Sequence, residues 1–176
     1  MDIAIEAFNK LQLPLKIIGE GNDYLNLKRN AKSNIEFLGW LSDREIAEFY
    51  SRCRAFIFPG EEDFGITPLE AQASGRPVIA YGKGGALESV IGKDLRNSPH
   101  GKVPTGIFFY EPTPESLFQA IKSFQEEDFD PYKIREHALE FDKEIFKKKI
   151  LSSIEEKFEL YHNHESPVLE TVEHYR

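Results

Sequence analysis

The sequence predicts an α/β protein built on a doubly wound, Rossmann-like parallel sheet. Short apolar runs of four or five residues recur along the chain, and most are followed by a glycine-containing or polar loop. After each loop the apolar residues change to helical spacing. This alternation is typical of parallel strands that are buried on both faces by crossover helices. The 176 residues suffice for one domain with a substantial core.

The first elements alternate in the expected way. An apolar helical face opens the chain and ends at Pro14, and residues 15–18 form an apolar strand that is followed by Gly19-Glu20-Gly21. Two glycines in this spacing are a weak indication of a dinucleotide-binding turn, because the third glycine of that fingerprint is absent. A simple tight turn is the alternative. A helix over residues 23–31 and a strand over 35–38 follow.

Ser42 and Glu45 have the spacing of a capping box, which predicts the start of the next helix. Apolar side chains then follow at every third or fourth position, at Ile46, Phe49, Tyr50 and Cys53. This spacing predicts a helix that packs these residues on the core. Cys53 is therefore expected to be a packed thiol and not a nucleophile.

The stretch 55–90 contains the clearest pattern. Residues 55–58 form an apolar run that Pro59-Gly60 stops, as expected for a strand buried on both faces. Thr67 and Pro68 are expected to begin a helix, with the threonine as N-cap and the proline at the first helical position. Gly75 is expected to end it.

A second strand–loop–helix unit follows. Residues 77–81 form an apolar strand, Gly82 to Gly85 form its loop, and a helix begins near Ala86. Both loops of the stretch come after the carboxyl ends of parallel strands, where open α/β sheets bind ligands. Because helix amino ends present unpaired N–H groups, this arrangement predicts a phosphate-binding site.

Two glutamates frame the first loop of this stretch. Glu62 lies in the loop and Glu70 in the first turn of the helix, with seven residues between them. Taken singly, Glu70 completes a capping box with Thr67, and Glu62 is an exposed carboxylate beside Glu61 and Asp63.

Taken together with Phe64-Gly65 between them and Gly84-Gly85 further on, the two glutamates resemble a family signature. It is that of the retaining nucleotide-sugar glycosyltransferases of the GT-B fold, family 4 (group 1). The resemblance extends less specifically from Asp2 to about Phe158 and concerns the carboxy-terminal, donor-binding half. The residues around Glu62 look most like those of mannosyltransferases of surface polysaccharide synthesis.

The resemblance implies roles for individual residues. The donor diphosphate would lie at the amino end of the helix near Thr67, Glu70 would bind the ribose, and Glu62 would contact the transferred sugar as the catalytic residue. The other residues that the resemblance places at the donor are Phe64, Gly65, Ile66, Gly19, Gly84 and Gly85. The resemblance implies neither a metal nor a cofactor, because the family is generally metal-independent.

The resemblance also implies a domain organisation. It predicts that residues 1–163 form the donor-binding domain without its usual first strand, and that residues 164–176 form a frayed tail. In the family, that strand precedes a loop with an arginine and a lysine that neutralise the diphosphate. An amino-terminal domain binds the acceptor, a glycan or lipid-linked sugar. None of these parts occurs in the sequence, so we expect the isolated chain to be nearly inactive.

The last third predicts a strand over Gly106 to Tyr110 and a helix capped by Thr113. From Pro131 onward the sequence predicts helix. An apolar stripe in it comprises Phe146, Ile150, Ile154, Phe158 and Tyr161. His100 is expected to be an exposed loop residue.

Composition excludes several classes. The formal net charge of −8 argues against a nucleic-acid partner. The single cysteine excludes an internal disulfide, and no apolar run is long enough to cross a bilayer. We therefore expect a cytoplasmic protein. Peripheral association with the inner face of the membrane through Lys147 to Lys149 is left open.

Three alternatives stay open at this point. The first is another GT-B enzyme, such as a sucrose- or trehalose-phosphate synthase or a phosphorylase. The second is a non-catalytic nucleotide-binding or scaffold module. The third is a generic doubly wound domain in which the motifs are only caps and turns. GDP-mannose is the first expectation for the donor and a UDP-sugar the second.

Overall fold

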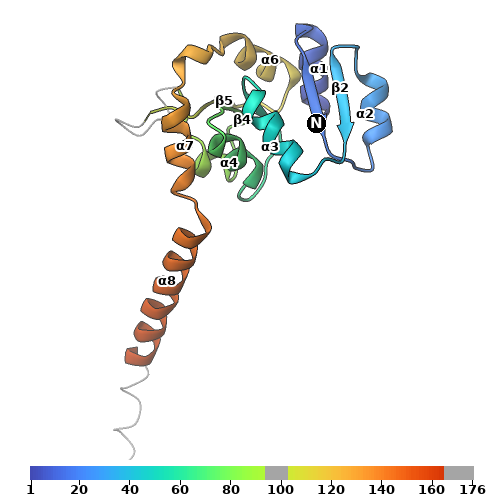
Figure 1. Ribbon diagram of the computed structural model, residues 1–176. Helices are drawn as coiled ribbons and strands as arrows, with labels where there is room; N and C mark the ends of the chain where they lie inside the picture. The colour runs from blue at the N-terminus through green and yellow to red at the C-terminus, as the bar shows by residue number, and fades with distance from the viewer. Residues whose placement is uncertain (94–102, 165–176) are drawn as a thin grey trace, which may run out of the picture. The chain divides into compact units, whose positions relative to one another are not determined.

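The computed structural model describes residues 1–93 and 103–164. The chain divides into two compact units, Met1–Leu139 and Glu140–Arg176, which we describe separately. The first unit contains, in chain order, α1 (Asp2–Leu11), β1 (Leu15–Ile18), α2 (Tyr24–Asn30), β2 (Ile35–Gly39), α3 (Asp43–Arg52), β3 (Phe56–Phe58), α4 (Ile66–Ala73), β4 (Val78–Tyr81), α5 (Ala86–Ser89), β5 (Gly106–Phe109), α6 (Pro114–Ser123), a 3-10 turn (Glu126–Asp128) and α7 (Pro131–Leu139) (Figure 1).

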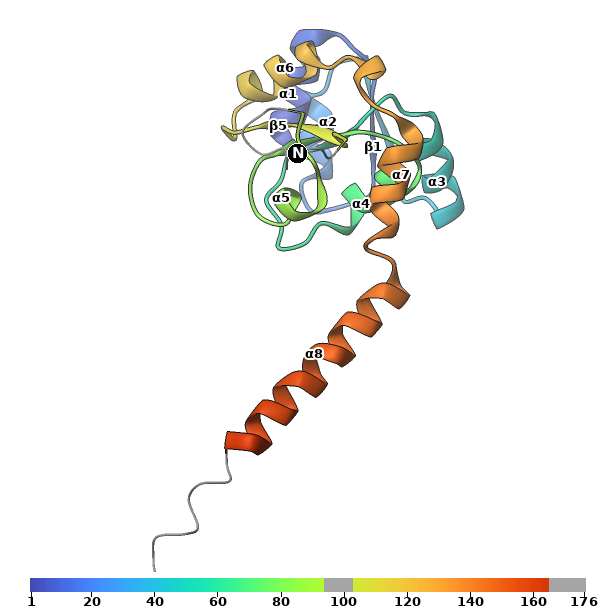
Figure 2. The same ribbon diagram turned by 90° about the vertical axis from the view of Figure 1, so that its left-hand side faces the viewer.

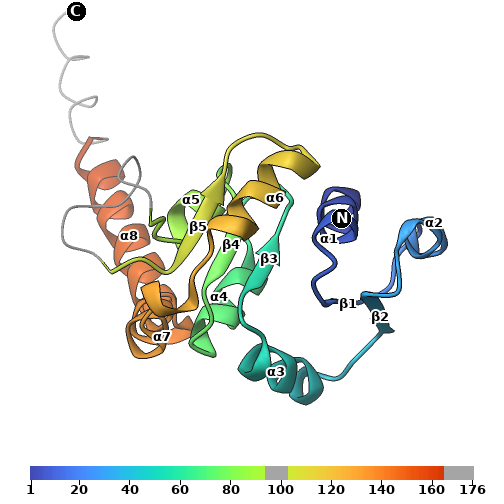
Figure 3. The same cartoon turned by 90° about the horizontal axis from the view of Figure 1, so that it is seen from above.

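All strand pairs among the described residues are parallel, as predicted. They form two separate sheets, one of β1 and β2 and one in the order β3-β4-β5. Leu15 pairs with Ile35 in the first sheet, and Phe56 pairs with Val78 in the second. The sequence predicted a single sheet, so the division between β1 and β3 is a difference that the structure reveals (Figure 3).

Helices cover both faces of the strands, which makes the fold doubly wound. On one face α1 contacts α2 and α6, and on the other α4 contacts α3 and α7. The views in Figures 1 and 2 both place α4 beside α7. The core lies between these layers, and its centre is β4, where Val78, Ile79 and Ala80 are at most 1% exposed. A strand this apolar needs cover on both faces, and it has it.

Two predictions of burial were wrong in degree. β3 was expected to be buried on both faces, but only Phe58 is buried, while Phe56 and Ile57 are half-buried. Similarly, no residue of α3 is buried, although Ile46 and Phe49 were expected to pack on the core. Both elements border the division between the sheets, where the strand edge and the helix face have no neighbouring strand among the described residues.

The predicted helix starts agree with the structure at two of three positions. Ser42 and Glu45 form a capping box at α3, and Thr113 caps α6 with Pro114 behind it. The prediction for Thr67 was wrong. α4 begins one residue earlier, at Ile66, and its N-cap is Gly65, whose φ of 77° is more accessible to glycine than to other residues.

The capping box at α3 yields a test of local stability. We expect Ser42→Ala to lower the free energy of unfolding by about 1 kcal/mol, because the Glu45 amide loses its side-chain acceptor. Urea denaturation followed by circular dichroism measures this change. Ser51→Ala is the control, because Ser51 lies near the other end of α3, where its hydroxyl donates to the Glu48 carbonyl. An equal effect of both substitutions would contradict a specific role of the cap.

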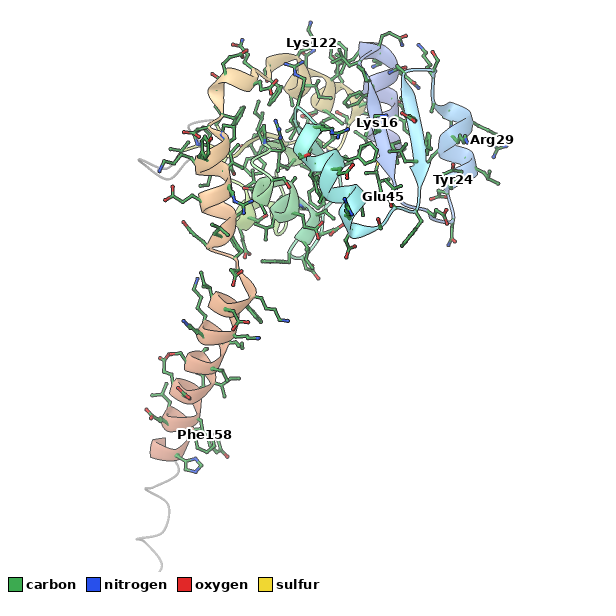
Figure 4. All side chains as sticks on the ribbon, in the orientation of Figure 1. Lys16, Tyr24, Arg29, Glu45, Lys122 and Phe158 are labelled. Carbon is green, nitrogen blue, oxygen red and sulfur yellow. The ribbon has the colours of Figure 1, made fainter. Side chains whose placement is uncertain are left out.

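The second unit consists of one described helix, α8 (Lys143–His164). The Asp142 carboxylate accepts a hydrogen bond from the Glu144 amide at 2.8 Å and so caps its start. The helix that was predicted from Pro131 onward is thus interrupted between Leu139 and Lys143. The predicted apolar stripe is exposed, with Phe146 at 62% and Phe158 at 60% (Figure 4). His100 and residues 165–176 lie outside the described residues.

Candidate functional site

The site lies at the carboxyl ends of β3 and β4. The loop after β3 contains Glu62, and the loop after β4 contains Gly84 and Gly85. The structure joins the two loops directly, since the Gly85 amide donates a hydrogen bond to the Glu62 carbonyl at 2.8 Å. Two motifs that lie more than twenty residues apart in the sequence therefore form one surface.

The glycine pair allows this approach because it has no side chains. A Cβ on Gly84 would lie 2.5 Å from the Glu62 carbonyl oxygen, and one on Gly85 would lie 2.4 Å from the Phe64 Cα. Gly84 also has a φ of 61°, in the left-handed region. Close backbone approach is a role that only glycine fills. In the structure the pair thus holds the Glu62 loop in place from behind.

An ion pair supports the same loop on its exposed side. The Lys83 ammonium lies 3.0 Å from the Glu61 carboxylate, and this hydrogen bond raises the pKa of Lys83. Both side chains are about half exposed, at 58% and 49%, so the pair adds little to stability. It does fix where the charge of Glu61 lies, beside Lys83.

Helix α4 begins directly after this loop, at Gly65. The first-turn N–H groups of a helix have no acceptors within the helix. Here they follow the Glu62 loop and a glycine cap that offers no side chain, so they are suited to an anion from outside. The buried Pro68 and Leu69 fix this end of α4 on the core.

Glu70 has a different partner from the one predicted. It does not form a capping box with Thr67, because α4 begins before that residue and has no side-chain cap. Instead its carboxylate accepts a hydrogen bond from the Tyr50 hydroxyl of α3 at 3.3 Å. Burial and the neighbouring Glu70 charge raise the pKa of Tyr50, so the hydroxyl keeps its proton and remains a donor.

A groove of about 1270 Å³ runs between β1 and β3, and we call it the inter-sheet groove. Its polar end is the site: Gly19, Glu62, Thr67 and Glu70 line it together. Gly19 follows β1 with a φ of 110°, and its amide donates to the Gly39 carbonyl at 2.8 Å. Four of the predicted site residues thus come from three separate segments and meet at one end of the groove.

The other predicted site residues lie around this group. The side chains of Phe64 and Ile66 are 45% and 65% exposed, and Gly65 caps α4. Gly84 and Gly85 lie behind the loop and do not line the groove.

The sequence did not identify Tyr50 as a site residue, because its spacing matched the apolar face of α3. Its position twenty residues before Glu70 carries no signal by itself. Cys53, on the same face, is half-buried, and burial raises the pKa of its thiol, so the thiolate is disfavoured. Among residues 1–93 and 103–164, no group of three His, Cys, Asp or Glu side chains is arranged to hold a metal.

No helix in the described part of the chain combines the length and the apolar character that crossing a membrane requires. The only long helix there is α8, which carries charged residues along its whole length.

Comparisons with known proteins agree with this fold. The chain is 36% identical over 96 residues to an uncharacterized glycosyltransferase of Methanocaldococcus jannaschii, covering 52% of this chain and 27% of that protein. It is 33% identical over 87 residues to the O-antigen chain mannosyltransferase C of Escherichia coli, covering 46% and 24%. The chain thus spans about a quarter of the length of these relatives.

A solved structure matches most of the chain. It is Anabaena HepE in complex with UDP and glucose, with a TM-score of 0.67 and 22% identity over 87% of this chain and 44% of HepE. This likeness confirms the predicted Rossmann-like fold of a GT-B half. The family described as glycosyl transferases group 1 matches residues 1–144. The chain therefore belongs to the group 1 glycosyltransferases.

Proposed function

We propose that this chain is the donor-binding half of a retaining glycosyltransferase and that it binds a nucleoside diphosphate sugar at the polar end of the inter-sheet groove. The observation that supports this most is the meeting of Gly19, Glu62, Thr67 and Glu70 at that end. Helix amides for an anion and carboxylates for hydroxyl groups are there within one site, as a nucleotide sugar requires.

The diphosphate would lie at the amino end of α4. Backbone N–H groups and the helix dipole would stabilise its negative charge, which increases on the leaving phosphate as the bond to the sugar breaks. The loop with Gly65 and Ile66 is held by the glycine pair behind it, so these amides are positioned before the donor arrives. Preorganised donors of this kind supply much of the catalytic effect in such sites.

The two glutamates would bind different parts of the donor. Glu70 would accept hydrogen bonds from the ribose hydroxyls, and Tyr50 would keep its carboxylate oriented through the 3.3 Å hydrogen bond. Glu62 would contact hydroxyls of the transferred sugar, assisted by the amides around Phe64. Because Glu70 is not engaged in a helix cap, its second oxygen remains available for the ribose.

We further propose a hexosyl transfer from GDP-mannose, or from a UDP-sugar, to a glycan or lipid-linked acceptor. The E. coli relative named as an O-antigen chain mannosyltransferase supports the first donor. The UDP in the HepE structure supports the second. The acceptor would bind to a domain outside residues 1–176, on the opposite side of the donor.

Saturation-transfer NMR with GDP, UDP and ADP tests the proposal. We expect one nucleotide to bind and expect Glu70→Ala to weaken it about 10- to 100-fold, because the ribose loses a charged acceptor worth about 1.5–3 kcal/mol. Glu155→Ala on the exposed face of α8 is the matched control and should bind like the parent chain. If no nucleotide binds even when the amino-terminal half is supplied, the donor-binding proposal is wrong and a scaffold role replaces it.

We expect nucleotide binding to persist in EDTA. In this site the charge of the diphosphate would be balanced by the amides and dipole of α4 and not by a divalent cation. The same NMR titration with EDTA, and then with added Mg²⁺ or Mn²⁺, measures this. A tenfold or larger gain of affinity on adding either metal would show that a cation takes part.

A further inference from the structure

We propose that the apolar part of the inter-sheet groove is a docking site for a single extended, apolar peptide strand from outside residues 1–176. The strand would pair in parallel with β1 on one side and with β3 on the other. It would thereby join the two sheets into one. This inference concerns the groove beyond the donor site and does not depend on which nucleotide binds.

The hydrogen-bonding edges on both sides of the groove carry the first argument. Among the described residues, β1 pairs only with β2, and β3 pairs only with β4. Both strands line the groove, whereas β2 and β5 contribute no residue of their far edges to it. Two parallel strands therefore present their second edges to the same space. Unpaired strand edges are templates for a further strand.

The ladder pattern shows which groups face the groove. In β1 the Leu15 amide donates to the Asn34 carbonyl at 3.0 Å, and in β3 the Phe56 amide donates to the Pro77 carbonyl at 2.9 Å. Because successive residues of a strand direct their N–H and C=O groups to opposite sides, those of Lys16 and Ile57 point to the groove. They provide donors and acceptors for both edges of one inserted strand.

The walls of the groove determine the side chains of its occupant. One wall is formed by Ala4 and Phe8 of α1 with Ile121 of α6, and the other by Ile46 and Phe49 of α3 with Cys53. Because side chains of a strand alternate between two faces, every position of the inserted strand would meet apolar atoms. A continuous run of valine, isoleucine or leucine fits this environment, as in parallel strands buried on both faces.

The half-buried state of the surrounding residues agrees with an occupant. α3 has the apolar spacing of a core helix, but none of its residues is buried, and Phe56 and Ile57 of β3 are half-buried. The length follows from β1, which has four residues. The carboxyl end of a parallel strand of that length would reach Gly19 and Glu62, so its last residue would border the donor site.

The experiment uses a synthetic peptide of about five valine and isoleucine residues between pairs of lysines. Trp40 is the chain's single tryptophan, lines the groove and is 74% exposed, so its fluorescence reports on the groove. We expect its emission to shift to shorter wavelength as the peptide binds. We also expect hydrogen exchange of the Lys16 and Ile57 amides to slow at least tenfold.

Controls separate pairing from mere attraction between a basic peptide and an acidic chain. The same peptide with N-methyl groups on alternate residues keeps its charge and side chains but loses backbone donors, so it should bind at least tenfold more weakly. Phe49→Asp should weaken the unmodified peptide to a similar degree. Phe146→Asp on α8, whose side chain is exposed, should leave it unchanged.

Three results would overturn the proposal. They are equal binding of the two peptides, no fluorescence or exchange change at millimolar peptide, and protection of Lys16 and Ile57 without peptide in a dimer detected by sedimentation velocity. The last result would place a second copy in the groove. Because these readouts contain no nucleotide, their failure would leave the donor-binding proposal intact, and nucleotide binding without peptide binding would separate the two.

Discussion

Replacing Gly85 with alanine is expected to destabilise the chain by about 3 kcal/mol and to displace the Glu62 loop. The new Cβ would lie 2.4 Å from the Phe64 Cα and 2.5 Å from the Asp63 carbonyl oxygen. These are backbone atoms, so no rotamer change can relieve the overlap, and the loop must move. Nucleotide binding should be lost along with the loop position. Urea denaturation and amide chemical shifts of residues 61–65 measure the two effects.

Gly60→Ala is the matched control for this prediction. Gly60 lies in the same loop, lines the groove, and has no atom within 4 Å of an added Cβ. Its substitution should change stability by less than about 0.5 kcal/mol and leave the loop in place. A Gly85→Ala chain as stable as the parent, with unchanged shifts in the Glu62 loop, would show that the glycine pair does not hold the site together.

The second large effect is expected in the core. Leu117 of α6 is fully buried in a cluster with Ile79, Phe109 and two alanines of α1. We expect Leu117→Ala to lower the free energy of unfolding by about 2–5 kcal/mol, because the cluster loses both the transfer free energy and the packing of the removed atoms. Chemical denaturation of the first unit, followed by circular dichroism, measures it.

Leu25→Ala provides the same chemical change at an exposed position. Leu25 lies on α2 and is 72% exposed, so its truncation should cost less than about 0.5 kcal/mol. The difference between the two variants isolates burial from helix propensity, since both residues are in helices. Similar values for both would mean that the α1–α6 layer does not form the core around β4.

Local sequence patterns were sufficient to predict most elements of the first unit. Capping residues marked the starts of α3 and α6, and the apolar run of β4 indicated a fully buried strand. Such signals are local because a cap or an apolar run depends on neighbours within a few residues. The site residues could also be named, since Glu62, Glu70 and the glycine pair belong to one compact stretch of sequence.

The start of α4 shows where local reasoning was insufficient. Thr67 and Pro68 have the cap-plus-proline pattern, yet the helix begins at Ile66. The packing of Gly65 against Phe58, 3.3 Å from an added Cβ, belongs to the tertiary structure, and no spacing encodes it. The same holds for Glu70, whose predicted local partner was Thr67 and whose actual partner is Tyr50 on another helix.

By itself, then, the sequence determined the parallel α/β class, the order of strands and helices in the first unit and the residues of the candidate site. Only the tertiary structure decided that the Glu62 loop rests on Gly85, that Tyr50 orients Glu70, and that β1 and β3 face each other across a groove. The physical reason is range. Caps and apolar periodicity act between near neighbours in the chain, whereas loop contacts and strand edges depend on backbone atoms that only folding brings together.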